Sequence, residues 1–174
     1  MPVADFFDML VQPAESVTFL ALQILVIAAG TVAVNFVLMR VADVVSWKTR
    51  KSDTFWDDIL VDAARLPVRL SLWLVGLSWI LMLLRARVDW AVFDYVDETR
   101  RVLFIAIMVF FALRFFKYME KALVDPARGE KVMDHTTASA ITKLLSTIVL
   151  VLAGMTILQT LGFSMSGVVA FGGV

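Results

Sequence analysis

The chain has 174 residues, of which 60% are hydrophobic and 18% charged, with a mean hydropathy of +0.85 and a formal net charge of zero. This apolar content exceeds what a soluble domain of that size can bury and predicts a membrane protein, while the balanced charge gives no sign of a nucleic-acid partner. The chain has no cysteine and one histidine, His135, which excludes disulfides, thiolate or multi-histidine metal sites and a cysteine nucleophile. We expect neither a metal nor another cofactor.

Residues 1–17 predict an external lead-in segment that is retained in the mature protein. A cleaved signal peptide begins with positive charge, whereas the early charges here are Asp5, Asp8 and Glu15. The apolar run 18–39 follows. At about 1.5 Å per residue it is long enough to cross a hydrocarbon core of about 30 Å, so we expect it to be the first membrane span.

Three further apolar runs are separated by charged loops and predict three more spans. They cover residues 68–84, 102–119 and 141–161. After a short break at residues 162–164 another apolar segment begins. The expected fold is an all-α membrane protein with four complete transmembrane helices and the start of a fifth.

Basic residues in the loops predict the orientation of these spans. The loops after the first and third runs carry Arg40, Lys48, Arg50, Lys51 and Arg65, and Lys117, Lys121, Arg128, Lys131 and Lys143, respectively. By the positive-inside rule both loops are cytoplasmic, so the N-terminus is expected outside. The loop between the second and third runs weighs against this orientation through Arg85, Arg87, Arg100 and Arg101.

Residues 53–66 predict an amphipathic helix on the cytoplasmic membrane surface, which enters the bilayer at Pro67, a residue type suited to an early helical position. Its apolar positions recur at helical spacing, at Trp56, Ile59, Leu60 and Ala63. Asp57, Asp58 and Asp62 fall on its other faces. They read as a solvated face, and the alternative is an oxygen-ligand site for Ca²⁺ or Mg²⁺.

Asp134 and Thr136 stand directly before the fourth apolar run, as a helix cap or linker. The stretches "SDTFWDDIL" and "DHTTASAIT" each place Asp and Thr ahead of an apolar helix, and aligning Thr54 with Thr136 also aligns Ile59 with Ile141. This pattern indicates a repeated helix-hairpin unit. The alternative is that Asp and Thr are independent N-caps, which accept hydrogen bonds from free amide groups.

The segment after the fourth run has one side that is almost bare of large side chains. Gly162, Ser166 and Ala170 recur every fourth position, and Gly167, Gly172 and Gly173 lie close by. Small residues let helices approach closely in lipid, and paired glycines allow a helix to bend. The segment is expected either to pack against the other spans of its own chain or to line a pore in a symmetric ring.

The run "MDHTTASAITKLLSTIVLVLAGMTILQTLGFSMSGVVAFGGV", residues 133–174, resembles the core of the small-conductance mechanosensitive channel family. The matching features are Asp134 and Thr136, the external turn "LGFSMSG", and "FGG" in the following helix. The upstream "WDDILVDAARLPVRLSLWLVGL" is similar to the corresponding region of larger members. Of the branches of this family, the sequence looks most like the five-span bacterial type, whose pore helix carries a glycine-rich "GGxGG" element.

This resemblance implies a homoheptamer in the bacterial inner membrane that opens under bilayer tension and releases ions and small solutes during hypoosmotic shock. Residues 18–131 would form the outer paddle in contact with membrane lipids, and residues 132–174 the channel core hairpin and the start of the pore helix. A longer pore helix and a cytoplasmic vestibule would follow. The pore-lining or hinge residues implied are Gly162, Ser166, Gly167, Ala170, Phe171, Gly172 and Gly173.

Two other classes of membrane protein stay open at the level of sequence. A secondary transporter would use broken, glycine-containing helices, but it would also carry ionisable groups deep inside its spans. Arg69, Arg114 and Lys143 lie near the ends of the runs instead. A non-conducting membrane scaffold is the other alternative. Enzyme activity is not expected, because nothing pairs His135 or a serine into a nucleophile and base.

Overall fold

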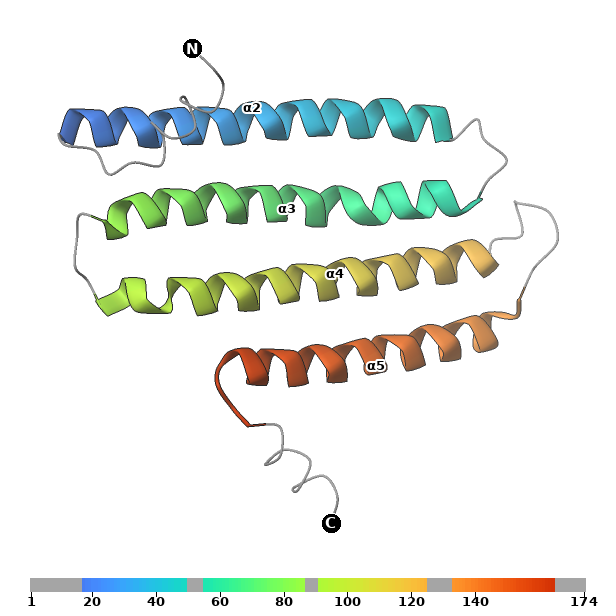
Figure 1. Cartoon of the computed structure of the whole chain (residues 1–174). Coiled ribbons are helices and arrows are strands. Elements are labelled where there is room, and N and C mark those ends of the chain that lie inside the picture. The colour runs from blue at the N-terminus through green and yellow to red at the C-terminus, as the bar shows by residue number, and fades with distance from the viewer. Residues whose placement is uncertain (1–16, 50–54, 87–90, 125–132, 165–174) are drawn as a thin grey trace.

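A computed structural model of the chain describes residues 17–49, 55–86, 91–124 and 133–164. These residues form four long helices, α2 (Val17–Thr49), α3 (Phe55–Arg85), α4 (Val96–Val124) and α5 (His135–Thr160), with a short 3₁₀ helix, η1 (Ala91–Tyr95), before α4 (Figure 1). All four long helices are long and apolar enough to cross a membrane. The all-α fold with four candidate spans is therefore confirmed. The expected fifth helix lies outside the described residues, and the external N-terminus stays a prediction.

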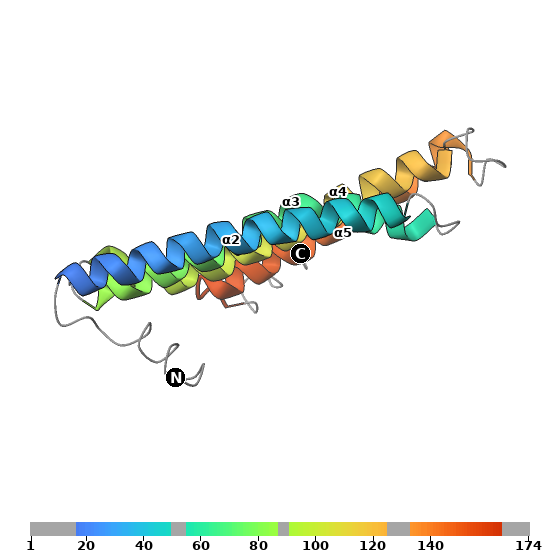
Figure 2. The same cartoon turned by 90° about the horizontal axis from the view of Figure 1, so that it is seen from above.

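The four long helices lie side by side in a single antiparallel row. Each packs on the helix that follows it in the chain: α2 on α3, α3 on α4, and α4 on α5. Figure 1 shows this order across the row, and the view turned by 90° in Figure 2 shows the helices overlapping one behind another. The fold is thus one layer of helices, whereas a four-helix bundle surrounds a shared core.

The single layer leaves most of the described large apolar side chains at least partly uncovered by protein. Few described apolar residues are buried: Ile27, Ile59, Ala63, Leu83, Phe93 and Ala138. By contrast, Leu25 and Met82 are 64% and 63% exposed. Such surfaces are unfavourable in water but suit contact with acyl chains, where helices associate through close packing rather than hydrophobic burial.

Two contacts fix how α2 and α3 lie along each other. At Gly76 an added Cβ would meet the Thr31 side chain, 2.8 Å from its Cγ2. Further along, Arg65 Nη2 donates a hydrogen bond to Asp43 Oδ1 at 2.8 Å. The contacts are 12 residues apart on α2 (31 to 43) and 11 on α3 (65 to 76). This near-equal spacing is what a straight antiparallel pair requires.

The early helical position predicted for Pro67 is wrong, because α3 runs continuously from Phe55 with Pro67 inside it. Entry of the chain into the bilayer at Pro67 stays a prediction. Proline cannot supply the N–H that the carbonyl four residues earlier, at Ala63, normally accepts. Pro67 is less than 2% exposed and Ala63 is fully buried, so the interrupted turn lies on the packed side of α3. The expected apolar face is present in part, because Ile59 and Ala63 are buried while Leu60 is half exposed.

The helices also extend beyond the apolar runs that predicted them. The helix α2 continues past Met39 to Thr49, and α4 begins at Val96 rather than Val102. The first turn of α4 contains Asp97 and Glu98, whose negative charge is favourable at a helix N-terminus. Hydrophobicity marks the part of a helix that meets hydrocarbon, whereas capping and charge determine where it ends.

Candidate functional site

The start of α5 is fixed by Asp134. Its Oδ2 accepts a hydrogen bond from the backbone N–H of Thr136 at 3.2 Å, and its own backbone is extended, with φ −68° and ψ 144°. Its carbonyl accepts from the N–H of Ala138 at 3.0 Å. This is the geometry of an N-cap residue, which satisfies amide groups that lack an intrahelical partner. Thr136 contributes its backbone, and its side chain is exposed.

The end of α5 is a tight turn around Gly162. The N–H of Gly162 donates to the carbonyl of Gln159, and the N–H of Phe163 donates to that of Leu158, both at 3.0 Å. Gly162 has a φ of +85°, the left-handed conformation that disfavours any residue with a Cβ. This pair of bonds is a Schellman motif, which satisfies the last carbonyls of a helix. Gly162 therefore ends α5 and sets the direction of the chain that follows.

Of the predicted pore-lining or hinge residues, the structure describes Gly162 alone. The other six lie outside the described residues, and they are Ser166, Gly167, Ala170, Phe171, Gly172 and Gly173. The acidic cluster of residues 53–66 is not fully described either, because the side chains of Asp57 and Asp58 lie outside the described ones. A pore role for the C-terminal segment and a metal at the acidic cluster both stay sequence-level hypotheses.

Among the described helices, α5 occupies one edge of the row and packs mainly on α4. Its buried residues, Ala138 and Thr142, are one turn apart, and the neighbour against which α5 packs is α4. Elsewhere on α5, Leu144 and Leu152 are 62% and 58% exposed, and a Cβ added at Gly154 would meet nothing within 4 Å. Part of the α5 surface is therefore open to lipid or to another helix.

The threonine hydroxyls near the middle and end of α5 are used within the helix. Thr147, Thr156 and Thr160 each donate to the carbonyl four residues earlier at 2.8 or 2.9 Å. Such bonds satisfy a hydroxyl without a partner from another element, which allows the helix surface to face hydrocarbon.

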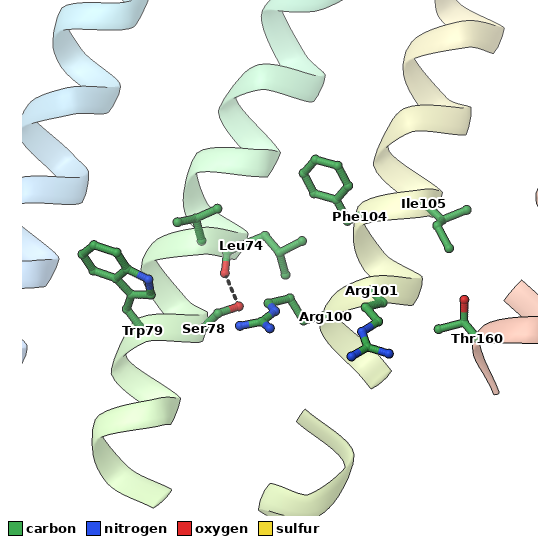
Figure 3. A pocket seen from close by; sticks show the side chains of 9 residues that line it. Leu74, Ser78, Trp79, Arg100, Arg101, Phe104, Ile105 and Thr160 are labelled. Carbon is green, nitrogen blue, oxygen red and sulfur yellow. Dashed lines mark hydrogen bonds between the residues drawn. The ribbon is translucent and has the colours of Figure 1, made fainter. Parts of the chain in front are cut away.

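A cleft of about 580 Å³ opens between α3, α4 and the end of α5. It is lined by Leu74, Val75, Ser78, Trp79, Arg100, Arg101, Phe104, Ile105 and Thr160. Figure 3 shows the two arginines extending from the first turns of α4, with α3 on one side and Thr160 on the other. From the sequence, the arginines had counted only as charges against the predicted orientation. The sequence does place Phe104 one turn after the arginines, which was a local signal of such a site. It gave no sign that residues of α3 and α5 would complete the cleft.

Ion pairs near the end of α3 and the start of α4 include Arg100 but not Arg101. Arg85 lies 3.3 Å from Asp94 and 3.7 Å from Asp97, and Arg100 lies 2.9 Å from Asp97. Arg101 forms no ion pair within the part of the chain that the structure describes. Among the described residues, Arg101 is therefore the arginine of the cleft that has no carboxylate within 4 Å.

Towards the C-terminal ends of α2 and α4, two arginines lie beside aromatic rings. Arg114 Nη2 donates to the Tyr118 hydroxyl at 3.0 Å, and its guanidinium carbon lies 5.3 Å from the centre of that ring. Arg40 lies at the same distance from the ring of Phe36. Arginine beside an aromatic residue is typical of a membrane–water interface. Both contacts indicate that the helices meet the headgroup region at this level.

No protein-family model, curated protein or solved structure matches the chain. The class of the protein therefore follows from its own fold. Four antiparallel helices, each long and apolar enough to cross a membrane and arranged in one layer, fit the class of multi-pass helical membrane proteins.

Proposed function

We propose that the chain is a subunit of a tension-gated channel that resembles the small-conductance mechanosensitive family. In this proposal several copies surround a pore in the bacterial inner membrane and release ions and small solutes in hypoosmotic shock. The family resemblance implies seven copies. The observation that supports it best is the single-layer arrangement, with α5 at one end of the row and a tight glycine turn after it.

A single layer of helices suits a sensor of bilayer tension. Tension favours the state that occupies more membrane area, and it can bias a protein only through a difference between its two states. Helices with lipid on both faces follow the surrounding bilayer closely. The exposed apolar residues of α2 and α3 give such contact, and no described helix is enclosed by the other three.

Coupling from this layer to a pore would run through α4 and α5. The two helices pack on each other, and α5 buries Ala138 and Thr142 near its capped start. Displacement of α4 would therefore carry α5 with it. The Schellman turn at Gly162 has a fixed backbone geometry, so a tilt of α5 would pass to the small-residue segment beyond it.

A non-conducting membrane scaffold is the second candidate, because the same open surface of α5 would equally accept a helix of another protein. The two functions differ in one direct measurement. The full-length protein is expressed in cells that lack their own tension-activated channels, and membrane patches are subjected to pressure steps. Reproducible single-channel currents that rise with tension are expected. Silence from protein that is demonstrably inserted and assembled would contradict the channel proposal and favour the scaffold.

A further inference from the structure

The cleft between α3, α4 and the end of α5 combines charge and apolar surface in a specific order along the membrane normal. A hydrocarbon core of about 30 Å takes about 20 helical residues. Centred on the candidate span Phe93–Val124, that core begins close to Thr99. Arg100 and Arg101 therefore lie at the boundary between headgroups and hydrocarbon, and Phe104 lies one turn deeper.

The lining residues of α5 and α3 are consistent with this position of the cleft at the boundary between headgroups and hydrocarbon. Thr160 is the last residue of α5, so it lies at the same boundary as the arginines. On α3 the lining continues inward from Trp79 and Ser78 to Val75 and Leu74. The Ser78 hydroxyl donates to the Leu74 carbonyl at 2.6 Å, so it is satisfied within its own helix. The deeper part of the cleft is therefore apolar in character.

The charge at the mouth of the cleft favours an anion. Asp97 lies 2.9 Å from Arg100 and compensates it, whereas Arg101 has no ion-pair partner among the described residues. A guanidinium presents several N–H donors to phosphate oxygens. Thr160 does not neutralise this charge, because its side chain is uncharged and its hydroxyl donates a hydrogen bond to the carbonyl of Thr156.

We propose that this cleft binds one anionic phospholipid, with its phosphate at Arg101 and an acyl chain against Leu74, Val75 and Ile105. A free phosphate ion would use the arginine but not the apolar wall below it. An acyl chain without an anionic headgroup would use the wall but not the charge. The volume of about 580 Å³ is within the range of small-molecule sites, which run from about 300 to 1,000 Å³.

The test uses Trp79 as the reporter, because it lines the cleft. The other four tryptophans of the sequence, Trp47, Trp56, Trp73 and Trp90, are replaced by Phe, and the protein is reconstituted with lipids that carry bromine on the acyl chains. Bromine quenches tryptophan on contact. We expect brominated phosphatidylglycerol to associate about fivefold more strongly than brominated phosphatidylcholine, which corresponds to the roughly 1 kcal/mol that one cation contributes near anionic lipid.

Three variants separate the site from general effects. Arg101→Gln should abolish the preference for the anionic lipid. Arg69→Gln is the matched control, because it removes one charge from α3 at a residue that does not line the cleft, and it should keep the preference. Val75→Phe fills the cleft and should reduce quenching by both lipids, which checks the apolar wall independently of charge.

Four outcomes would overturn the proposal. They are an unchanged preference in Arg101→Gln, an equal loss in Arg69→Gln, displacement of the lipid by millimolar inorganic phosphate, and no quenching by either lipid, which would mean that protein covers the cleft. No current is recorded in this experiment. Lipid binding and tension-gated conduction can therefore fail independently of each other.

Discussion

The closest approach of α2 and α3 gives the sharpest test of the fold. We predict that Gly76→Ala weakens the pairing of these helices, because the new Cβ would lie 2.8 Å from Thr31 Cγ2, where ordinary contacts begin at 3.4 Å. Thr31 Oγ1 would lie closer still, so either the helices must separate or Thr31 must change its rotamer. Threonine is stiff at χ1, and its hydroxyl is held by a bond to the Ile27 carbonyl at 2.8 Å. Overpacking of this kind costs about 1–3 kcal/mol.

The assay is reversible unfolding in mixed micelles, with the free energy of unfolding read from the loss of helix signal as denaturing detergent increases. Gly30→Ala is the matched control: it is a neighbour of Thr31 on α2, and its added Cβ would meet nothing within 4 Å. It should be neutral or stabilising by up to about 1 kcal/mol, from helix propensity. Thr31→Ala should recover most of the loss in the Gly76→Ala background. Equal stability of the two alanine variants, or no recovery in the double variant, would refute the contact.

Three further predictions concern the ends and edges of the helices. Gly162→Ala should destabilise the α5 turn by about 1–2 kcal/mol, because an L-residue is strained at φ +85°, while Gly154→Ala should not; the same unfolding assay distinguishes them, and equal effects would contradict the Schellman geometry. Asp134→Ala should cost about 0.5–2 kcal/mol and speed amide hydrogen exchange in the first turn of α5, whereas Asp134→Asn should preserve most protection. A double-mutant cycle of Arg65 and Asp43 should give a coupling below about 1 kcal/mol that falls with salt, since their side chains are 36% and 63% exposed; a larger, salt-independent value would require a drier contact.

The spans were predictable from the sequence because each needs only a long apolar run. The run 18–39 lies within α2, and the run 141–161 lies within α5 except for its last residue. The ends were less predictable. Asp43 looks like a loop residue, but it lies inside α2, where Arg65 of the next helix pairs with it. Pro67 looks like a helix start, but it lies buried inside α3. For Asp43, a contact with a residue distant in sequence is what local preference could not indicate.

The candidate sites divide in the same way. The capping role of Asp134 could be read from its position before an apolar run, since an N-cap is a local feature. The cleft could not, because Trp79, Arg101 and Thr160 come from three different helices, and nothing local indicates that they line one space. The predicted pore residues beyond Gly162 lie outside the described part of the chain, so their role stays a prediction.

The order of the helices in the row has a consequence for biosynthesis. Every substantial packing contact of the described helices joins neighbours in sequence, α2 with α3, α3 with α4 and α4 with α5. During membrane insertion each new helix therefore finds its packing partner in the one released immediately before it. No helix waits for a distant segment to be translated, and loop closure between partners involves short loops. The layer can grow in the direction of synthesis, one helix at a time.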